Sequence, residues 1–147
     1  MTAVNRSRSA DIRLQITRLI LHQLLGSRQH TISSASKRTT LSAMFLVAFY
    51  GFLRVGELTT KSQASFSNVF QYSNGSFRMI SADICGVKIT LTRFKHYTNN
   101  GPHDIIIDRN DSLPFCSVKS LLGYLGLRGH SHAPLFCTFE GSPITTR

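Results

Sequence analysis

The apolar segment from Leu41 to Thr59 constrains the fold more than any other part of the sequence. Its first half reads LSAMFLVAFY, with large apolar side chains on nearly every side of a helix. Such a helix has no face suited to water and belongs inside a core. Thr39 and Thr40 can supply N-cap oxygens in front of it, and Gly51 weakens the helix near its far end. We therefore expect a buried helix that ends close to Gly51.

An arginine follows this apolar segment directly. Glu57 stands three residues after Arg54, within reach across one helical turn. A charge at the edge of a core costs desolvation unless it has a partner. Two interpretations stay open. Either Glu57 holds the guanidinium in an ordinary ion pair at a helix end, or the planar guanidinium is held for an anion such as a phosphate.

The net charge favours a polyanionic partner. Lys and Arg number 17 and Asp and Glu number 7, which gives a formal charge of +10 at pH 7, and twelve of the cations are arginine. A charge of this sign and size suits nucleic acid. The 147 residues, 41% of them hydrophobic, fit one modest domain with a core.

The cysteine and histidine pattern gives no sign of a metal or disulfide site. Cys85, Cys116 and Cys137 are far apart without a C-x-x-C pair, and are expected as small buried apolar residues. His130 and His132 have no third ligand nearby. We therefore expect no metal and no other cofactor. The sequence also has no apolar run of membrane-spanning length and no secretory signal, so a soluble, intracellular protein is expected.

The N-terminal part predicts a tail and one amphipathic helix. Residues 1–10 are polar and basic and are expected to be disordered. The helix is expected from Asp11, capped by Ser9 or Asp11, to Gly26, with a loop over residues 27–36. Its core-facing stripe is expected to be Ile12, Ile16, Leu19, Ile20 and Leu24. Its polar stripe is expected at the surface with Asp11, Gln15, Arg18 and His22.

Two cations stand at the start of the second helix. Lys37 and Arg38 oppose the helix dipole there, because the N-terminus of a helix is positive. A nearby anion would favour this placement, although two exposed charges at a loop end are also common. Both residues are therefore candidate contacts for a polyanion.

The middle of the chain predicts strands. A short hairpin is expected over residues 67–80 around the turn pair Asn74-Gly75. A clearer alternation of apolar and polar residues runs over 86–107, where two strands flank a connection that holds Arg93, Lys95, His96 and His103. This connection is either an ordinary solvated loop or a cationic tip that enters a groove.

The last third predicts a helix capped by Ser117 and then irregular chain. Its apolar positions are Val118, Leu121, Leu122 and Leu125, and Tyr124 lies near them as a packing residue. A loop over 126–133, an extended piece over 133–136 and a turn over 140–143 are expected next. Residues 144–147 are expected to open another helix. The predicted class is α+β, mainly helical with a small antiparallel sheet or hairpin.

Taken together, four features resemble the catalytic domain of tyrosine recombinases, the phage-integrase family. The resemblance is greatest to the versions carried by eukaryotic mobile elements of the Crypton and DIRS-like kinds. The features are GFLRVGELT, the hairpin with Lys95, the segment CSVKSLLGYL, and PLF followed by GSPIT. Their order and spacing cover the chain from about Asp11 to its end.

The resemblance implies specific roles for these residues. Arg54 would bind the scissile phosphate of DNA, supported by Glu57, and Lys95 would help protonate the departing 5′ oxygen. Fixed cations suit this task, since an attacked phosphodiester gathers negative charge on its oxygens, and an amine can donate a proton. Four further residues are candidate DNA contacts: Arg93, His96, Lys37 and Arg38.

The resemblance also implies a partial domain. The family's H-x-x-R motif and nucleophilic tyrosine follow the PLF segment, so residues 11–147 are expected to be inactive alone, because the reaction needs a 3′-phosphotyrosine. Double-stranded DNA is the implied partner, with a homo-oligomer on DNA in the complete protein and a nuclear location. The alternative is a non-enzymatic basic nucleic-acid-binding protein of the RNA-associated or ribosomal type. The pattern Arg54-x-x-Glu57 behind an apolar helix favours the recombinase.

Overall fold

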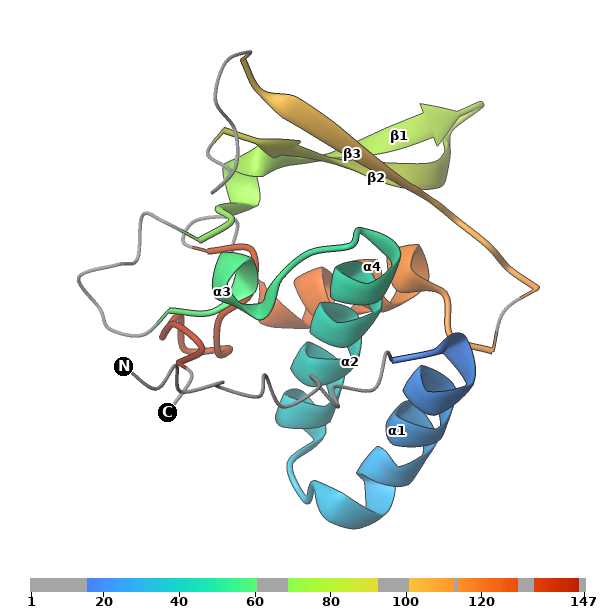
Figure 1. Ribbon diagram of the computed structural model, residues 1–147, viewed down its shortest axis with the longest axis vertical. Helices are drawn as coiled ribbons and strands as arrows, with labels where there is room; N and C mark the ends of the chain where they lie inside the picture. The colour runs from blue at the N-terminus through green and yellow to red at the C-terminus, as the bar shows by residue number, and fades with distance from the viewer. Residues whose placement is uncertain (1–15, 61–68, 93–100, 113, 130–133, 146–147) are drawn as a thin grey trace, which may run out of the picture.

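The structure is a computed structural model that describes residues 16–60, 69–92, 101–112, 114–129 and 134–145. Figure 1 shows a small sheet at one end of the molecule, helices beneath it, and a further helix on the side away from the sheet. The architecture is α+β, mainly helical with a three-stranded antiparallel sheet of order β1-β2-β3. The expected fold class is confirmed at this level. The elements are α1 (Arg18–Thr31), α2 (Ala35–Tyr50), α3 (Val55–Leu58), η2 (Tyr72–Asn74), β1 (Gly75–Ile80), β2 (Asp83–Leu91), β3 (His103–Asp108) and α4 (Ser117–Arg128).

The main core lies between the sheet and the packed pair α2 and α4. Val87, Ile89 and Leu91 of β2 are buried at alternate positions, as the sequence pattern predicted. On the opposite side of α2, Leu46 packs against Leu21 and Leu25 of α1. Because α2 is covered from both sides, its apolar residues are needed on nearly its whole circumference. The prediction of a buried helix ending near Gly51 is confirmed.

The first helix differs from its prediction in both phase and extent. Helix α1 begins after the N-cap Thr17, passes through Gly26 and ends at Thr31. It buries Leu21 and Leu25, while most of the expected core stripe is exposed: Ile16, Leu19, Ile20 and Leu24. The prediction was wrong because both sides of this helix are apolar, so spacing alone could not identify the side that meets α2. Residues 1–15, with the rest of the predicted stripe, lie outside the described residues.

His22 and the predicted loop over 27–36 also need correction. His22 is half-buried and meets the edge of the Phe115 ring, with 5.6 Å between ring centroids. Only residues 32–34 lie between α1 and α2, since the cap of α2 is Ser34, whose hydroxyl accepts from the Lys37 N–H at 3.4 Å. Thr39 and Thr40 are inside the helix, where their hydroxyls donate back to carbonyls one turn earlier.

The sheet confirms one predicted hairpin and corrects the other. Strands β2 and β3 pair antiparallel from Gly86 opposite Asp108 to Leu91 opposite His103. The pair Asn74-Gly75, expected to turn a hairpin, instead ends η2 and begins β1. The turn between β1 and β2 is made by Ser81 and Ala82, whose φ angles of 48° and 71° are those of a type I′ turn. A turn without Asn or Gly gave no local signal.

The C-terminal part differs from its prediction at the boundaries. Cys116 is the N-cap of α4, one residue before the expected cap Ser117, and the helix continues to Arg128, where Gly129 ends it with a φ of 74°. The turn over 140–143 is confirmed by a bond of 2.8 Å from the Thr138 N–H to the Ser142 carbonyl. Residues 144–145 do not begin a helix. They pair in parallel with residue 60, because the Ile144 carbonyl accepts from the Thr60 N–H at 3.0 Å.

Candidate nucleic-acid interface

The junction between α2 and α3 has the bonding of a Schellman cap. The Leu53 N–H donates to the Ala48 carbonyl at 2.9 Å, and the Phe52 N–H donates to the Phe49 carbonyl at 3.4 Å. This geometry requires a left-handed residue after the cap Gly51. Phe52 takes that place with a φ of 53° and leaves its ring 94% exposed.

This unusual phenylalanine gives a stability prediction. Phe52→Gly is expected to raise the free energy of unfolding by about 1 kcal/mol, since the left-handed conformation is unfavourable for residues with a Cβ and the exposed ring contributes no burial. Phe52→Ala is the matched control, because it removes the ring but keeps the Cβ. Urea denaturation should show stabilisation in the glycine variant alone. A less stable glycine variant would contradict the prediction.

Arg54 lies immediately after this cap and is exposed. It is the N-cap residue of α3, and its backbone N–H donates to Oε2 of Glu57 at 2.6 Å. The contact of the Glu57 carboxylate is therefore with the Arg54 backbone, which fixes the start of α3. The i, i+3 spacing predicted that these two residues lie together, but the bond from Glu57 to the Arg54 backbone was not among the two interpretations left open.

The short helix α3 is held to the rest of the fold by its backbone. The Phe70 N–H donates to the Glu57 carbonyl at 2.9 Å, and the Thr60 N–H, just after the helix, donates to the Ile144 carbonyl at 3.0 Å. Leu58 is buried in the main core. Arg54 thus begins an anchored element, so its side chain extends from a fixed backbone position.

The α3 helix is close to the sheet end from which the β2–β3 connection leaves. The chain from Phe70, bonded to α3, to Gly75 spans at most about 17 Å even if extended. Gly75 pairs with Ile89 of β2, which pairs in turn with Ile105 of β3. In Figure 1 these strand ends lie on the side of the molecule where α3 is drawn. Lys95, Arg93 and His96 belong to the connection itself and lie outside the described residues.

Lys37 and Arg38 lie at the other end of α2 from Arg54. From Arg38 to the last residue of α2, Tyr50, the helix rises by about 18 Å. The structure therefore does not gather these two cations around Arg54. Arg38 is half-buried and donates to the carbonyls of Ile32 and Ser33 at 2.6 and 2.9 Å, and Lys37 is exposed.

A buried arginine is the structural residue that the sequence analysis missed. Arg128 is 4% exposed, and its guanidinium donates to the carbonyls of Pro134 and Leu135, both at 2.7 Å. It also lies over the rings of Tyr72 and Tyr124, 5.7 and 6.0 Å from their centroids. Arg128 therefore joins the end of α4 to the PLF segment.

Tyr124 is a packing residue, as predicted. Its ring is fully buried, its hydroxyl accepts from the Cys137 N–H, and it donates to the Cys137 carbonyl, both at 2.9 Å. Burial raises the pKa of this hydroxyl. A buried hydroxyl engaged in this way is not presented to a substrate.

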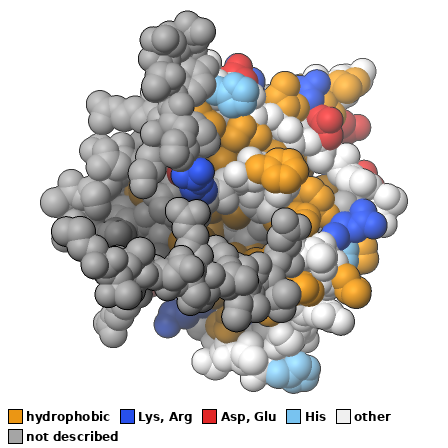
Figure 2. Space-filling view, viewed as in Figure 1, with side chains coloured by type: hydrophobic (Ala, Val, Ile, Leu, Met, Phe, Trp, Pro, Cys, Tyr) orange, Lys and Arg blue, Asp and Glu red, His pale blue; other side chains and the backbone are white. Residues whose placement is uncertain are grey.

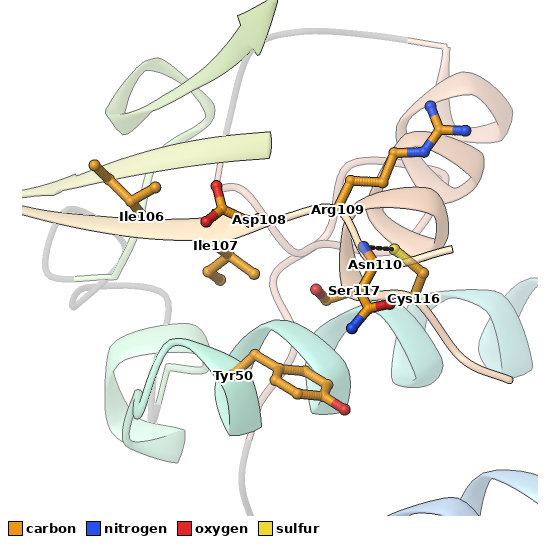
Figure 3. A pocket seen from close by; sticks show the side chains of 8 residues that line it. All are labelled: Tyr50, Ile106, Ile107, Asp108, Arg109, Asn110, Cys116 and Ser117. Atoms are coloured by element: carbon orange, nitrogen blue, oxygen red, sulfur yellow. Dashed lines mark hydrogen bonds between the residues drawn. The ribbon is translucent and has the colours of Figure 1, made fainter. Parts of the chain in front are cut away.

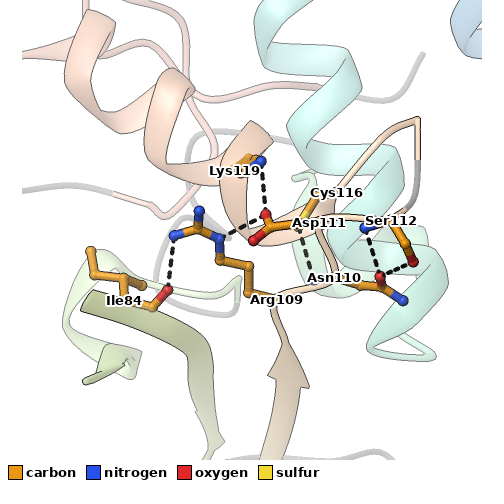
Figure 4. Close-up of polar contacts among 7 residues, drawn as sticks. All are labelled: Ile84, Arg109, Asn110, Asp111, Ser112, Cys116 and Lys119. Carbon is orange, nitrogen blue, oxygen red and sulfur yellow. Dashed lines mark hydrogen bonds and ion pairs between the residues drawn. The ribbon is translucent and has the colours of Figure 1, made fainter. Parts of the chain in front are cut away.

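A hollow of about 260 Å³ lies where β3 ends and α4 begins (Figure 3). Its wall includes Tyr50, Asn110 and Cys116, with the Asn110 N–H donating to the Cys116 Sγ at 3.3 Å. Beside it, Asp111 accepts from Arg109 at 2.9 Å and pairs with Lys119 at 2.7 Å (Figure 4). These hydrogen bonds hold the pKa of Asp111 below its ordinary value. None of the predicted site residues that the structure describes lines this hollow.

The cysteines, possible metal ligands and possible membrane-spanning helices remain to be placed within the described residues. Cys116 and Cys137 are buried as predicted, whereas Cys85 is half-buried, and all three are free thiols. The described part of the chain holds no cluster of three His, Cys, Asp or Glu side chains placed to bind a metal ion. No described helix combines the length and apolarity needed to cross a membrane.

Comparison with known proteins found no relative of this chain. No protein-family model, no curated protein and no solved structure matches the chain.

Proposed function

We propose that the chain is the DNA-binding N-terminal half of a tyrosine-recombinase catalytic domain, in which Arg54 and Lys95 contact one backbone phosphate. In the complete enzyme, DNA would be broken and rejoined through a 3′-phosphotyrosine. The 147-residue chain would bind duplex DNA without cleaving it. A homo-oligomer on DNA and a nuclear location belong to the same proposal.

The observation that carries the proposal is the position of Arg54. It is an exposed cation on a fixed backbone, at the junction of a buried helix and a short anchored one. The backbone that carries this guanidinium is already fixed, and the planar group can make two parallel hydrogen bonds to a phosphate. The formal charge of +10 supplies the attraction for the rest of the duplex.

The order of elements after Arg54 supports the same proposal. A three-stranded antiparallel sheet follows, and the connection of its second and third strands bears Lys95. The strand ends that flank this connection lie on the side of the molecule where α3 is drawn (Figure 1). A lysine reaching from such a connection could therefore meet a phosphate bound by Arg54.

The proposal predicts salt-dependent binding with coupled effects of Arg54 and Lys95. The affinity for duplex DNA should fall as the salt concentration rises. Arg54→Ala should weaken binding by at most about tenfold, which corresponds to about 1.4 kcal/mol of binding free energy. If both cations neutralise one phosphate, the double variant with Lys95→Ala should lower the slope of log K against log salt by only about 0.9, as for one phosphate. Fluorescence anisotropy with a labelled duplex measures both quantities.

Arg78→Ala is the control for this experiment, since Arg78 pairs with Asp108 at 2.6 Å on the sheet and should change binding little. Additive losses, with a slope change of about 1.8 in the double variant, would place Arg54 and Lys95 on different phosphates and contradict a shared site. A flat salt response would remove DNA as the partner.

A further inference from the structure

A second hollow, lined by two arginines, lies at the end of the molecule remote from the sheet. Its volume is about 310 Å³, and it lies between α1, α2 and α4. We name it the three-helix groove. The residues that line it are Arg28, Gln29, Ala35, Arg38, Thr39, Ser42, Ser120 and Gly123. Two are arginines, three carry hydroxyl groups and none is acidic.

The two arginines of the groove are half-buried, and their partners among the described residues are neutral. Arg28 donates to the Ser42 hydroxyl and lies 5.5 Å from the centre of the Phe115 ring. Arg38 donates to backbone carbonyls of the α1–α2 connection. No carboxylate of the described residues is within ion-pair distance of either guanidinium. Partial burial without a counter-ion is unfavourable, and an anion in the groove would offset that cost.

The surroundings keep this region positive. The sequence has no Asp or Glu from residue 12 to residue 56. The positive end of the α2 dipole is also here, and no acidic residue occupies its first turn. In Figure 2 the acidic side chains visible on the drawn face lie in the upper half of the molecule and not in its lower part.

We infer that the three-helix groove is a second phosphate-binding site, separate from Arg54, that receives a backbone phosphate of the bound nucleic acid. The guanidinium groups supply charge and N–H donors, and the Ser120 hydroxyl is a further polar group of the lining. The hydroxyls of Thr39 and Ser42 already donate to the carbonyls of Ala35 and Arg38. The assignment of this phosphate to a nucleic-acid backbone rests on the proposed function. Duplex DNA has a phosphate charge every about 1.7 Å along its axis. A contact about 18 Å along α2 from the Arg54 end can therefore fall on the same duplex.

Gly123 allows a test that leaves both arginines in place. A Cβ built at this residue meets no atom within 4 Å, and the residue is exposed on α4. Gly123→Asp should therefore place a negative charge in the groove without disturbing its packing. Gly123→Asn is its neutral counterpart of nearly equal shape. Gly26→Asp on α1, where a Cβ also meets nothing within 4 Å, controls for net charge, because Gly26 is not part of the groove.

The first measurement titrates each variant with inorganic phosphate and follows the Nε–H signals of Arg28 and Arg38 by NMR. These signals should shift in the original protein, in Gly123→Asn and in Gly26→Asp, and should not shift in Gly123→Asp. The second measures duplex affinity by anisotropy. Gly123→Asp should bind the duplex about tenfold more weakly than Gly123→Asn. The slope of log K against log salt should be smaller in magnitude by about 0.9 for Gly123→Asp.

Equal phosphate titrations for Gly123→Asp and Gly123→Asn would overturn the inference. So would a phosphate response without any difference in DNA affinity, since the groove would then serve a small oxyanion instead. If DNA binds and depends on Arg54 but not on the groove, this inference fails while the proposed function stands. If no variant binds DNA, the proposed function fails, and with it the assignment of a nucleic-acid phosphate to the groove.

Discussion

Replacing Arg128 with methionine is expected to lower the free energy of unfolding by about 2 to 6 kcal/mol. The guanidinium is 4% exposed and donates to the carbonyls of Pro134 and Leu135. Methionine fills much of the same space but cannot donate, so two buried carbonyls would lose a partner at about 1 to 3 kcal/mol each. The contacts of the cation with the two tyrosine rings would be lost as well.

Urea denaturation followed by circular dichroism checks this prediction. Arg18→Met on the exposed start of α1 is the matched control and should change stability by less than about 0.5 kcal/mol. Arg128→Lys should recover part of the loss, because an ammonium can reach a carbonyl but lacks the planar fork of the guanidinium. A loss for Arg128→Met no larger than that for Arg18→Met would show that this buried contact contributes little.

The role of Arg128 illustrates what local sequence patterns could not predict. The sequence placed residue 128 in a loop, because two glycines follow Leu122 before it and a third comes directly after it. The need for a donor arises only when the PLF segment folds against the end of α4. That need depends on carbonyls that are six and seven residues further along the chain. No spacing rule within a helix or a strand contains this information.

The buried face was predicted correctly for strand β2, whose residues alternate strictly, but not for helix α1, which is apolar on two sides. The alternation in β2 identifies one face, so Val87, Ile89 and Leu91 were placed correctly. Helix α1 has apolar residues on both sides, and only the contact with Leu46 of α2 decides that Leu21 and Leu25 are buried. The start of α2 was missed by several residues, since Thr39 and Ser34 are equally suitable N-cap residues by type.

The candidate site was predicted in part. The position of Arg54 at the end of a buried helix follows from the sequence, because the apolar run stops there. The use of Glu57 as a backbone cap does not follow, since the same i, i+3 spacing serves an ion pair and a cap equally well. The three-helix groove was missed except for Arg38. It joins Arg28 to a glycine and a serine of α4, which are far from it in sequence.

A second large effect is expected from Gly86→Ala in the middle strand. A Cβ at this residue would lie 2.9 Å from the Ile107 carbonyl oxygen and 3.3 Å from Oδ1 of Asp108. Gly86 pairs with Arg78 on one side and Asp108 on the other, and these two side chains pair with each other at 2.6 Å. The glycine therefore allows the ion pair to bridge from β1 to β3. Alanine would have to push β3 away from β2, at a cost of about 1 to 3 kcal/mol.

Gly75→Ala is the matched control, because it lies in the same sheet and its Cβ would meet the Tyr72 carbonyl oxygen at an ordinary 3.5 Å. Its free energy of unfolding in urea should stay within about 0.5 kcal/mol of the original protein. If β2 and β3 carry Lys95 to the phosphate bound by Arg54, Gly86→Ala should also weaken DNA binding under conditions where it remains folded. Equal stability of the two alanine variants would contradict the close contact at Gly86. Unchanged DNA affinity in a destabilised Gly86→Ala would instead separate the sheet from the proposed phosphate site.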